Sequence, residues 1–238
     1  MTDQRPINRI LVVTAHPDDV DFGAGGAVAT WTAQGVDVGY CIVTDGDAGG
    51  FDPTVPRDQI ARIRRLEQTE AAKVLGVTEL TFLGYPDGRL EATLDLRRDI
   101  SREIRRFRPD VVVCQSPVRD FSRIYASHPD HLSAGEATLS AVYPDARNRF
   151  TFTELVDEGF EPHAAWQVWM MAGPNPTTFI DTTDVFDRKI EALLCHKSQH
   201  QNPDGLGSRI RSWNEAIAQT GGLRAGRTAE AFQIVETG

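Results

Sequence analysis

The chain has 238 residues, of which 40% are hydrophobic and 25% charged, an ordinary composition for a globular protein with a sizeable core. It carries 25 Lys and Arg against 34 Asp and Glu, a formal net charge of −9. This balance disfavours nucleic acid and anionic membranes as main partners, because both are bound through basic surfaces. The apolar runs are far shorter than the ~20 residues of a transmembrane helix, and residues 1–6 lack the layout of a signal peptide.

Strands and helices alternate along the first 144 residues. The β-branched run Ile10-Leu11-Val12-Val13 predicts a buried strand. Further strands are expected over 36–44, 80–83 and 110–114, and helices over 22–34, 57–75, 94–107 and 132–142. This alternation of apolar strands with helices predicts an α/β fold with a doubly wound, mainly parallel, Rossmann-like sheet covered by helices on both faces. In such a sheet the active site lies at the rim formed by the carboxyl ends of the strands.

The pattern is weaker beyond residue 144. We expect strands over 166–172, 178–181 and 232–235 and helices over 184–196 and 208–219, while residues 150–162 are mixed. Thr183 or Asp184 is a candidate N-cap of the helix over 184–196. Because no linker divides the chain, we expect a single domain over residues 1–238.

Three scattered cysteines indicate a reducing compartment. Cys41, Cys114 and Cys195 form no CxxC pair and leave one cysteine unmatched, so a disulfide framework is not expected. Cys41 and Cys114 lie in apolar, strand-like runs, where packing in the core is the simplest role. We therefore expect a cytoplasmic protein.

Two polar clusters follow the first and fourth strands. Ala15-His16-Pro17-Asp18-Asp19 contains an imidazole and two carboxylates, and His128-Pro129-Asp130-His131 contains two more imidazoles and a carboxylate. Either cluster alone could be a turn in which an Asp caps a helix. A catalytic zinc, however, usually takes three protein ligands and keeps a fourth position for water. Two such clusters at one sheet rim indicate a metal site, with His16 and Asp19 supplying two of its ligands.

These clusters resemble the two signature motifs of the PIG-L/LmbE-like zinc deacetylases. The resemblance also takes in the Arg64-x-x-Glu67 helix, Asp87-Gly88 and Ala229-Glu230-Ala231-Phe232, so it spans nearly the whole chain. Members of that family remove acetyl groups from N-acetylglucosaminyl compounds or cleave related amides. The resemblance therefore implies a metal-dependent amide hydrolase that removes an N-acetyl group from a small amino-sugar substrate of the N-acetylglucosamine type.

The resemblance also assigns roles to the two clusters. It implies that Zn²⁺, or another divalent transition metal, is bound by His16, Asp19 and His131, and that Asp18 is the general base. His128 would stabilise the tetrahedral intermediate or protonate the leaving amine, with Asp130 orienting it. These roles agree with the chemistry, since a bound zinc lowers the pKa of water toward about 7 and a free carboxylate can then accept the proton.

Arg64, Asp87 and Asp47 are the predicted substrate-binding residues. Arg64 would bind a sugar hydroxyl or phosphate, although its charged helix could equally be a solvated face. Asp87 is an ordinary turn residue by chemistry, and its place at the rim favours sugar binding. Asp47 stands where many relatives carry Glu, so a shared substrate contact is less certain.

Two other positions depart from the family pattern. Val20 replaces the Glu that usually follows the second Asp, and Asp21 could supply the same charge near a helix N-terminus. Ala126 stands where some relatives have a Tyr, with Tyr125 beside it.

Two alternatives to an N-acetyl hydrolase are considered. Gly23-x-Gly25-Gly26 superficially resembles the phosphate loop of a nucleotide-binding module, but Val28 stands where that motif needs Gly or Ala. The neighbouring carboxylates would also repel a phosphate, so these glycines more plausibly let the first helix approach the sheet. The second alternative is an amidase for a larger thiol conjugate of the mycothiol type, or for a natural-product amide. A homo-oligomer is compatible with the sequence.

Overall fold

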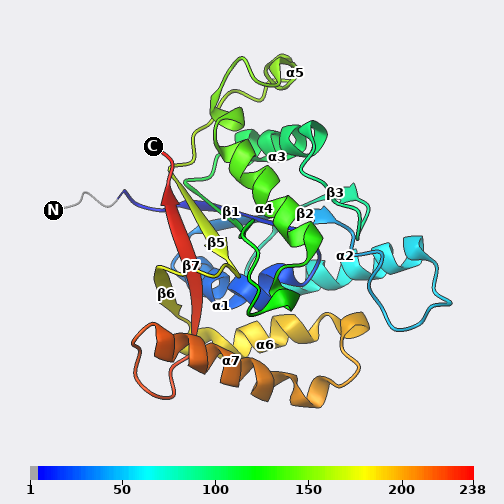
Figure 1. Cartoon of the computed structure of the whole chain (residues 1–238), viewed down its shortest axis with the longest axis vertical. Helices are drawn as coiled ribbons and strands as arrows, with labels where there is room; N and C mark the ends of the chain where they lie inside the picture. Colours follow the sequence, from blue (N-terminus) through cyan, green and yellow to red (C-terminus); the bar gives the residue numbers. More distant parts are fainter. Residues whose placement is uncertain (1–4) are drawn as a thin grey trace.

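The computed structural model describes residues 5–238, so part of the segment tested for a signal peptide, residues 1–4, lies outside the described residues. Within the described chain, seven strands form one sheet in the order β3-β2-β1-β4-β5-β7-β6 (Figure 1). The strands are β1 (Arg9–Thr14), β2 (Asp37–Thr44), β3 (Glu79–Tyr85), β4 (Val111–Gln115), β5 (Gln167–Met171), β6 (Thr178–Asp181) and β7 (Ala229–Glu236).

The sheet is parallel from β3 to β5, and β7 is antiparallel to both of its neighbours, β5 and β6. The predicted doubly wound α/β fold is therefore confirmed. The sequence did not indicate the placement of the last strand between β5 and β6. An antiparallel strand needs no crossover helix beside it, so β7 can enter the sheet directly after the chain returns from the helices near its carboxyl end.

Helices cover both faces of the sheet (Figure 1). One face carries α1 (Asp19–Ala33), α2 (Arg57–Val74), α6 (Phe186–Leu194) and α7 (Leu206–Thr220), and the other carries α3 (Leu94–Phe107) and α4 (Pro129–Val142). The short α5 (Thr153–Asp157) lies beyond α3 and α4. Side chains of β1 alternate between two cores, with Ile10 and Val12 in one and Leu11 and Val13 in the other. A strand buried on both faces explains the continuous apolar run that predicted it.

Helix starts are less well predicted than helix positions. α1 begins at Asp19 and α4 at Pro129, each three residues before the expected start, because both motifs form the first helical turns themselves. The expected N-cap at Thr183 or Asp184 is wrong. A 3-10 turn over Thr183–Val185 comes first, and its start is held by Asp181 Oδ1, which accepts the backbone N–H and the hydroxyl of Thr183.

A buried ion pair ties the C-terminal elements to α1. The carboxylate of Glu230 on β7 accepts the backbone N–H groups of Gly26 and Ala27, at 2.9 and 2.7 Å, in the middle of α1. It also pairs with Lys189 of α6, whose ammonium donates to the carbonyl of Phe22. Since both charged side chains are at most 2% exposed, each depends on the other for a partner of opposite charge. The last strand thus fixes the helix that begins at the candidate site.

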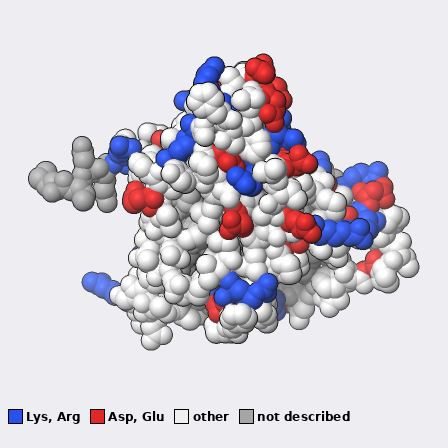
Figure 2. Space-filling view, turned by 45° about the horizontal axis from the view of Figure 1, so that its top comes forward, with Lys and Arg blue, Asp and Glu red and all other residues white. Residues whose placement is uncertain are grey.

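Charges on the surface are mixed. Figure 2 shows Lys and Arg interspersed with Asp and Glu on the face that it presents. On α3 four of the five arginines pair with carboxylates, as in Arg97 with Asp145 at 2.9 Å and Arg106 with Glu103 at 2.9 Å. Among residues 5–238, no helix combines the length and the apolar character required to span a bilayer.

Two glycines of α1 differ in how closely other atoms pack against them. A Cβ at Gly26 would lie 2.7 Å from Cβ of the buried Thr182, whereas at Gly25 it would meet Lys189 at an ordinary 3.5 Å. We expect Gly26→Ala to lower the free energy of unfolding by about 1–3 kcal/mol through overpacking. The matched control Gly25→Ala should leave it unchanged or raise it by up to ~1 kcal/mol. Urea denaturation measures both, and equal effects would contradict the packing role of Gly26.

Candidate active site

Both sequence motifs lie at the carboxyl ends of the adjacent strands β1 and β4. Here the chain switches from one face of the sheet to the other, because α1 and α2 cover one face while α3 and α4 cover the opposite one. The N–H of Ala15 donates to Gln115 Oε1 at 2.9 Å, which joins the two strand ends. A Cβ at Gly135 would collide with the carbonyl oxygen of Gln115, so this glycine lets α4 approach the end of β4. These contacts bring His128 and His131, at the start of α4, to the motif after β1.

The three predicted metal ligands, His16, Asp19 and His131, lie together. His16 Nδ1 lies 3.3 Å from His131 Nε2 and 3.3 Å from Asp19 Oδ2, and His131 Nε2 lies 3.0 Å from Asp19 Oδ1. Ligands about 2.0–2.1 Å from a zinc ion at tetrahedral angles are about 3.3 Å apart. The carboxylate is held in place by the backbone N–H of His16, which donates to Asp19 Oδ2 at 2.7 Å. The donor atoms and their spacing therefore fit a tetrahedral metal.

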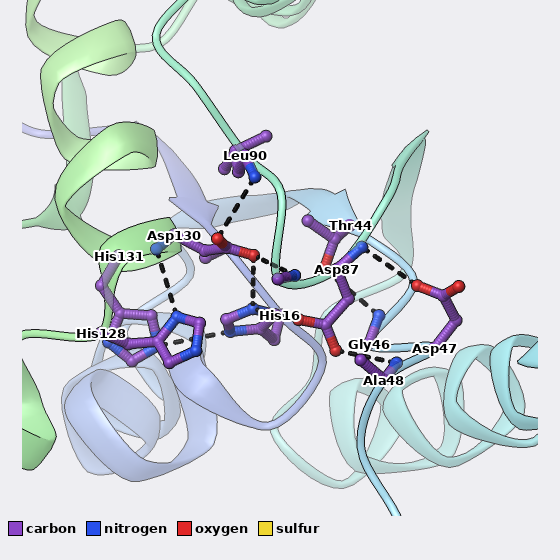
Figure 3. A network of polar contacts seen from close by, with 12 residues as sticks. His16, Thr44, Gly46, Asp47, Ala48, Asp87, Leu90, His128, Asp130 and His131 are labelled. Carbon is purple, nitrogen blue, oxygen red and sulfur yellow. Dashed lines mark hydrogen bonds and ion pairs between the residues drawn. The ribbon is translucent and has the colours of Figure 1, made fainter.

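The other nitrogen of His16 faces two further carboxylates (Figure 3). His16 Nε2 lies 3.0 Å from Asp87 Oδ1 and 3.3 Å from Asp130 Oδ2. Burial lowers the pKa of His16, but Asp19, Asp130 and Asp87 outweigh burial and raise this pKa to about 12. Burial likewise opposes ionisation of Asp19, yet His131 and His16 hold its pKa well below the usual range. The surroundings of His16 therefore favour a positive charge, which a metal cation can supply in place of a proton.

The described residues also allow other groupings of metal-binding atoms. His16 can group with His128 and His131, or with Asp87 and Asp130. In the second grouping the carboxylates are already anchored, since Asp87 Oδ2 accepts the N–H of Ala48 and Asp130 accepts those of Gly88 and Leu90. Carboxylates that accept a hydrogen bond from a ligand histidine fix its orientation and its tautomer. The molecule thus contains a candidate metal site centred on His16.

Asp18 lies beside the ligands in a left-handed backbone conformation, with φ 82°. Its N–H donates to Gln68 Oε1 at 2.7 Å, and its carboxylate accepts a hydrogen bond from Arg64 at 3.1 Å. Burial raises the pKa of Asp18 to about 6, although Arg64 lowers it. A carboxylate with a pKa close to neutrality is suited to accept and return a proton at neutral pH.

His128 is held by backbone rather than by a carboxylate. Its Nδ1 accepts the N–H of Asp130 at 3.1 Å (Figure 3). The prediction that Asp130 orients His128 therefore needs correction, because the Asp130 carboxylate contacts His16 and the 88–90 backbone instead. Since Nδ1 is an acceptor, the neutral imidazole carries its proton on Nε2. His128 is exposed and can present that N–H to a substrate.

Arg64, Asp87 and Asp47 all have protein partners at this rim. Arg64 is 4% exposed and also donates to the carbonyls of Pro17 and Gly46, so the solvated-face interpretation does not hold for it. Asp87 lies between His16 and the loop after β2, as described above. Asp47 accepts the N–H of Asp87 at 3.0 Å and pairs with Arg57 at 2.7 Å. These contacts support the shape of the site, and direct binding of the sugar by these residues stays a prediction.

Sequence reasoning missed a buried chain of side chains behind Asp18. Gln68 Nε2 donates to Asp21 Oδ2 at 2.9 Å, and His196 Nε2 lies 2.9 Å from the same oxygen. The sequence indicates Asp21 only as a charge near a helix N-terminus and assigns no role to His196, but both are fully buried. The spacing of Arg64 and Gln68, four residues apart on one face of α2, was the available signal.

Comparisons with known proteins identify the family of this chain. The PIG-L family, described as GlcNAc-PI de-N-acetylase, matches residues 11–142. Diacetylchitobiose deacetylase of Thermococcus kodakarensis is 31% identical over 230 residues, covering 96% of this chain and 84% of the relative. A probable N-acetyl-alpha-D-glucosaminyl L-malate deacetylase 2 of Bacillus anthracis is 31% identical, covering 80% of each. The structure of N,N'-diacetylchitobiose deacetylase from Pyrococcus horikoshii, determined with its inhibitor MPG, superposes with a TM-score of 0.88 at 27% identity, covering 96% of this chain and 84% of the other.

The family match covers 132 of the 238 residues and includes both motifs, His16 to Asp19 and His128 to His131. Relatives and the solved structure extend the similarity over nearly the whole chain. The protein therefore belongs to the PIG-L family of de-N-acetylases.

Proposed function

We propose that this protein is a zinc-dependent hydrolase that removes the N-acetyl group from a small amino-sugar substrate of the N-acetylglucosamine type. The convergence of the donor atoms of His16, Asp19 and His131 within 3.0–3.3 Å of one another is the observation that carries this proposal. The family and its deacetylase relatives support an amide hydrolase acting on amino sugars.

His16, Asp19 and His131 would hold the metal, with Asp87 and Asp130 orienting His16 through its Nε2. A bound zinc would polarise the amide carbonyl and acidify water. Asp18 accepts a proton from the attacking water and delivers it to the amine nitrogen as the C–N bond breaks. His128 donates its Nε2–H to the carbonyl oxygen while negative charge develops there. The products are a carboxylate and the free amino sugar.

The location, the domain organisation, the assembly and the identity of the metal belong to the same proposal. All three cysteines are free thiols, as is usual in reducing compartments, which supports a cytoplasmic location. All seven described strands share one sheet, which supports a single domain over residues 1–238. Assembly as a homo-oligomer stays a prediction. Zinc suits a site of two imidazoles and one carboxylate, and other divalent transition metals share these ligands.

Removal of a ligand tests the metal site. We expect His16→Ala and His131→Ala to lose both stoichiometric zinc and turnover, because two remaining ligands hold the ion too weakly. Metal content by mass spectrometry and release of acetate from N-acetylglucosamine, diacetylchitobiose and thiol-conjugate amides measure this. His163→Gln is the matched control, since His163 contacts the carbonyl of Pro109 and not the site. Full activity of the metal-free protein would refute the mechanism.

Asp18→Asn tests the assignment of the base. Asn tolerates the left-handed backbone that Asp18 adopts but cannot accept the proton. Turnover should fall by roughly a hundredfold or more, while zinc content and the unfolding midpoint stay near the wild-type values. Wild-type turnover in this variant would show that another group is the base.

A further inference from the structure

A cavity of about 370 Å³ adjoins the candidate metal site. Asp19 and His131 line one end, and the walls are apolar, formed by Phe22 of α1, Met171 of β5, and Ile210 and Trp213 of α7. Met171 and Ile210 are 2% and 6% exposed, so these walls are firmly packed. Any group held in this cavity would lie next to the carbon that is attacked.

The proposed base and the proposed oxyanion donor lie outside this cavity. Among the described residues, the cavity lining includes two predicted metal ligands but neither Asp18 nor His128. Asp18 instead contacts Arg64 and Gln68 of α2, on the β2–β3 side of the sheet. The two substituents of the scissile amide leave the carbonyl carbon in different directions. The apolar cavity and the polar side of the site are therefore suited to different parts of one substrate.

The lining favours an acyl chain over a sugar ring. A pyranose carries several hydroxyls, and each loses free energy when it is buried without a partner. Gln115, Arg123 and Tyr125 are the few polar side chains on the cavity wall away from the metal ligands. Arg123 is already paired with Asp120 at 3.1 Å, and Gln115 accepts the N–H of Ala15. An aliphatic chain requires none of these groups and gains from each apolar contact.

The size and the mouth of the cavity indicate a chain longer than acetyl. The volume equals that of roughly a dozen water molecules in the liquid, at about 30 Å³ each, so a single methyl group would leave most of it unfilled. Tyr125 lines the cavity and is 76% exposed, which places it at the mouth. The loop that carries it also exposes Val118, Phe121 and Ile124. The cavity thus opens beside a loop with exposed apolar side chains.

We propose that this cavity is an acyl-group site and that N-butanoyl and N-hexanoyl amino sugars are hydrolysed with a higher kcat/KM than the N-acetyl compound. This inference rests on the proposed function, since it uses the same metal and the same base. The reaction is the hydrolysis described above. The carbonyl–nitrogen bond breaks, a carbon–oxygen bond to water forms, the amine takes the proton, and the acyl chain leaves as a carboxylate.

An acyl series on one sugar tests the site in the zinc-loaded protein. With glucosamine carrying acetyl, butanoyl or hexanoyl groups, kcat/KM should rise by up to about fourfold for each added methylene that is buried. Calorimetric titration of the carboxylate products should give the same order, with hexanoate bound more tightly than acetate. This second measurement needs no turnover.

Two variants of α7 test whether the acyl chain binds in this cavity. Ile210→Phe narrows the cavity, so the hexanoyl-to-acetyl ratio of kcat/KM and the preference for hexanoate should both fall at least tenfold. Ile217→Phe is the matched control, because Ile217 lies on the same helix but lines only a neighbouring cavity. This variant should keep both preferences.

A flat acyl series with acetyl hydrolysis intact would overturn the acyl site and leave the deacetylase function standing. Absence of hydrolysis for every amide would overturn both. A gain that depends on a second sugar ring, with no gain from longer acyl chains, would assign the cavity to the sugar instead.

Discussion

The imidazole of His16 is the feature on which the site depends. One nitrogen faces Asp19 and His131, and the other faces Asp87 and Asp130, so a single ring joins the candidate metal position to the carboxylates behind it. Those carboxylates are anchored by backbone N–H groups from the loops after β2 and β3. The strand ends of the sheet therefore act together to set the orientation and tautomer of one ligand.

The left-handed turn at Asp18 places the proposed base beside Asp19, a proposed metal ligand. Two buried residues of α2, Gln68 and Arg64, form hydrogen bonds with Asp18. Gln68 is held in turn by Asp21, and Asp21 by His196. Because a non-glycine residue at positive φ is strained, the hydrogen bonds that Asp18 makes with Gln68 and Arg64 help to offset the strain. His196, from the C-terminal half of the chain, thus supports the turn indirectly, through Asp21 and Gln68.

The same C-terminal part also shapes the space beside the metal site. The pairing of Glu230 with Lys189 and with the backbone of α1 fixes that helix against β7. Gly23 of α1 lies against Met171 of β5, and a side chain at this position would displace Met171. The result is an apolar cavity between α1, β5 and α7 that is lined by Asp19 and His131, two of the proposed metal ligands, and not by Asp18, the proposed base.

The amino-acid sequence by itself determined the fold class, the metal ligands' neighbourhood and the family. Apolar strands alternating with helices are a local pattern, and the carboxyl ends of parallel strands in a doubly wound sheet lie at one rim, so the motifs after β1 and β4 were expected there. Only the tertiary structure decided the contacts of Asp130 and Asp87 with His16, the burial of Arg64, the antiparallel β7 and the cavity. These features join residues far apart in the chain, such as Asp18 with Gln68 and Asp21 with His196. The local hydrophobic pattern cannot predict such pairings, because they form only when the packed helices and strands bring the side chains together.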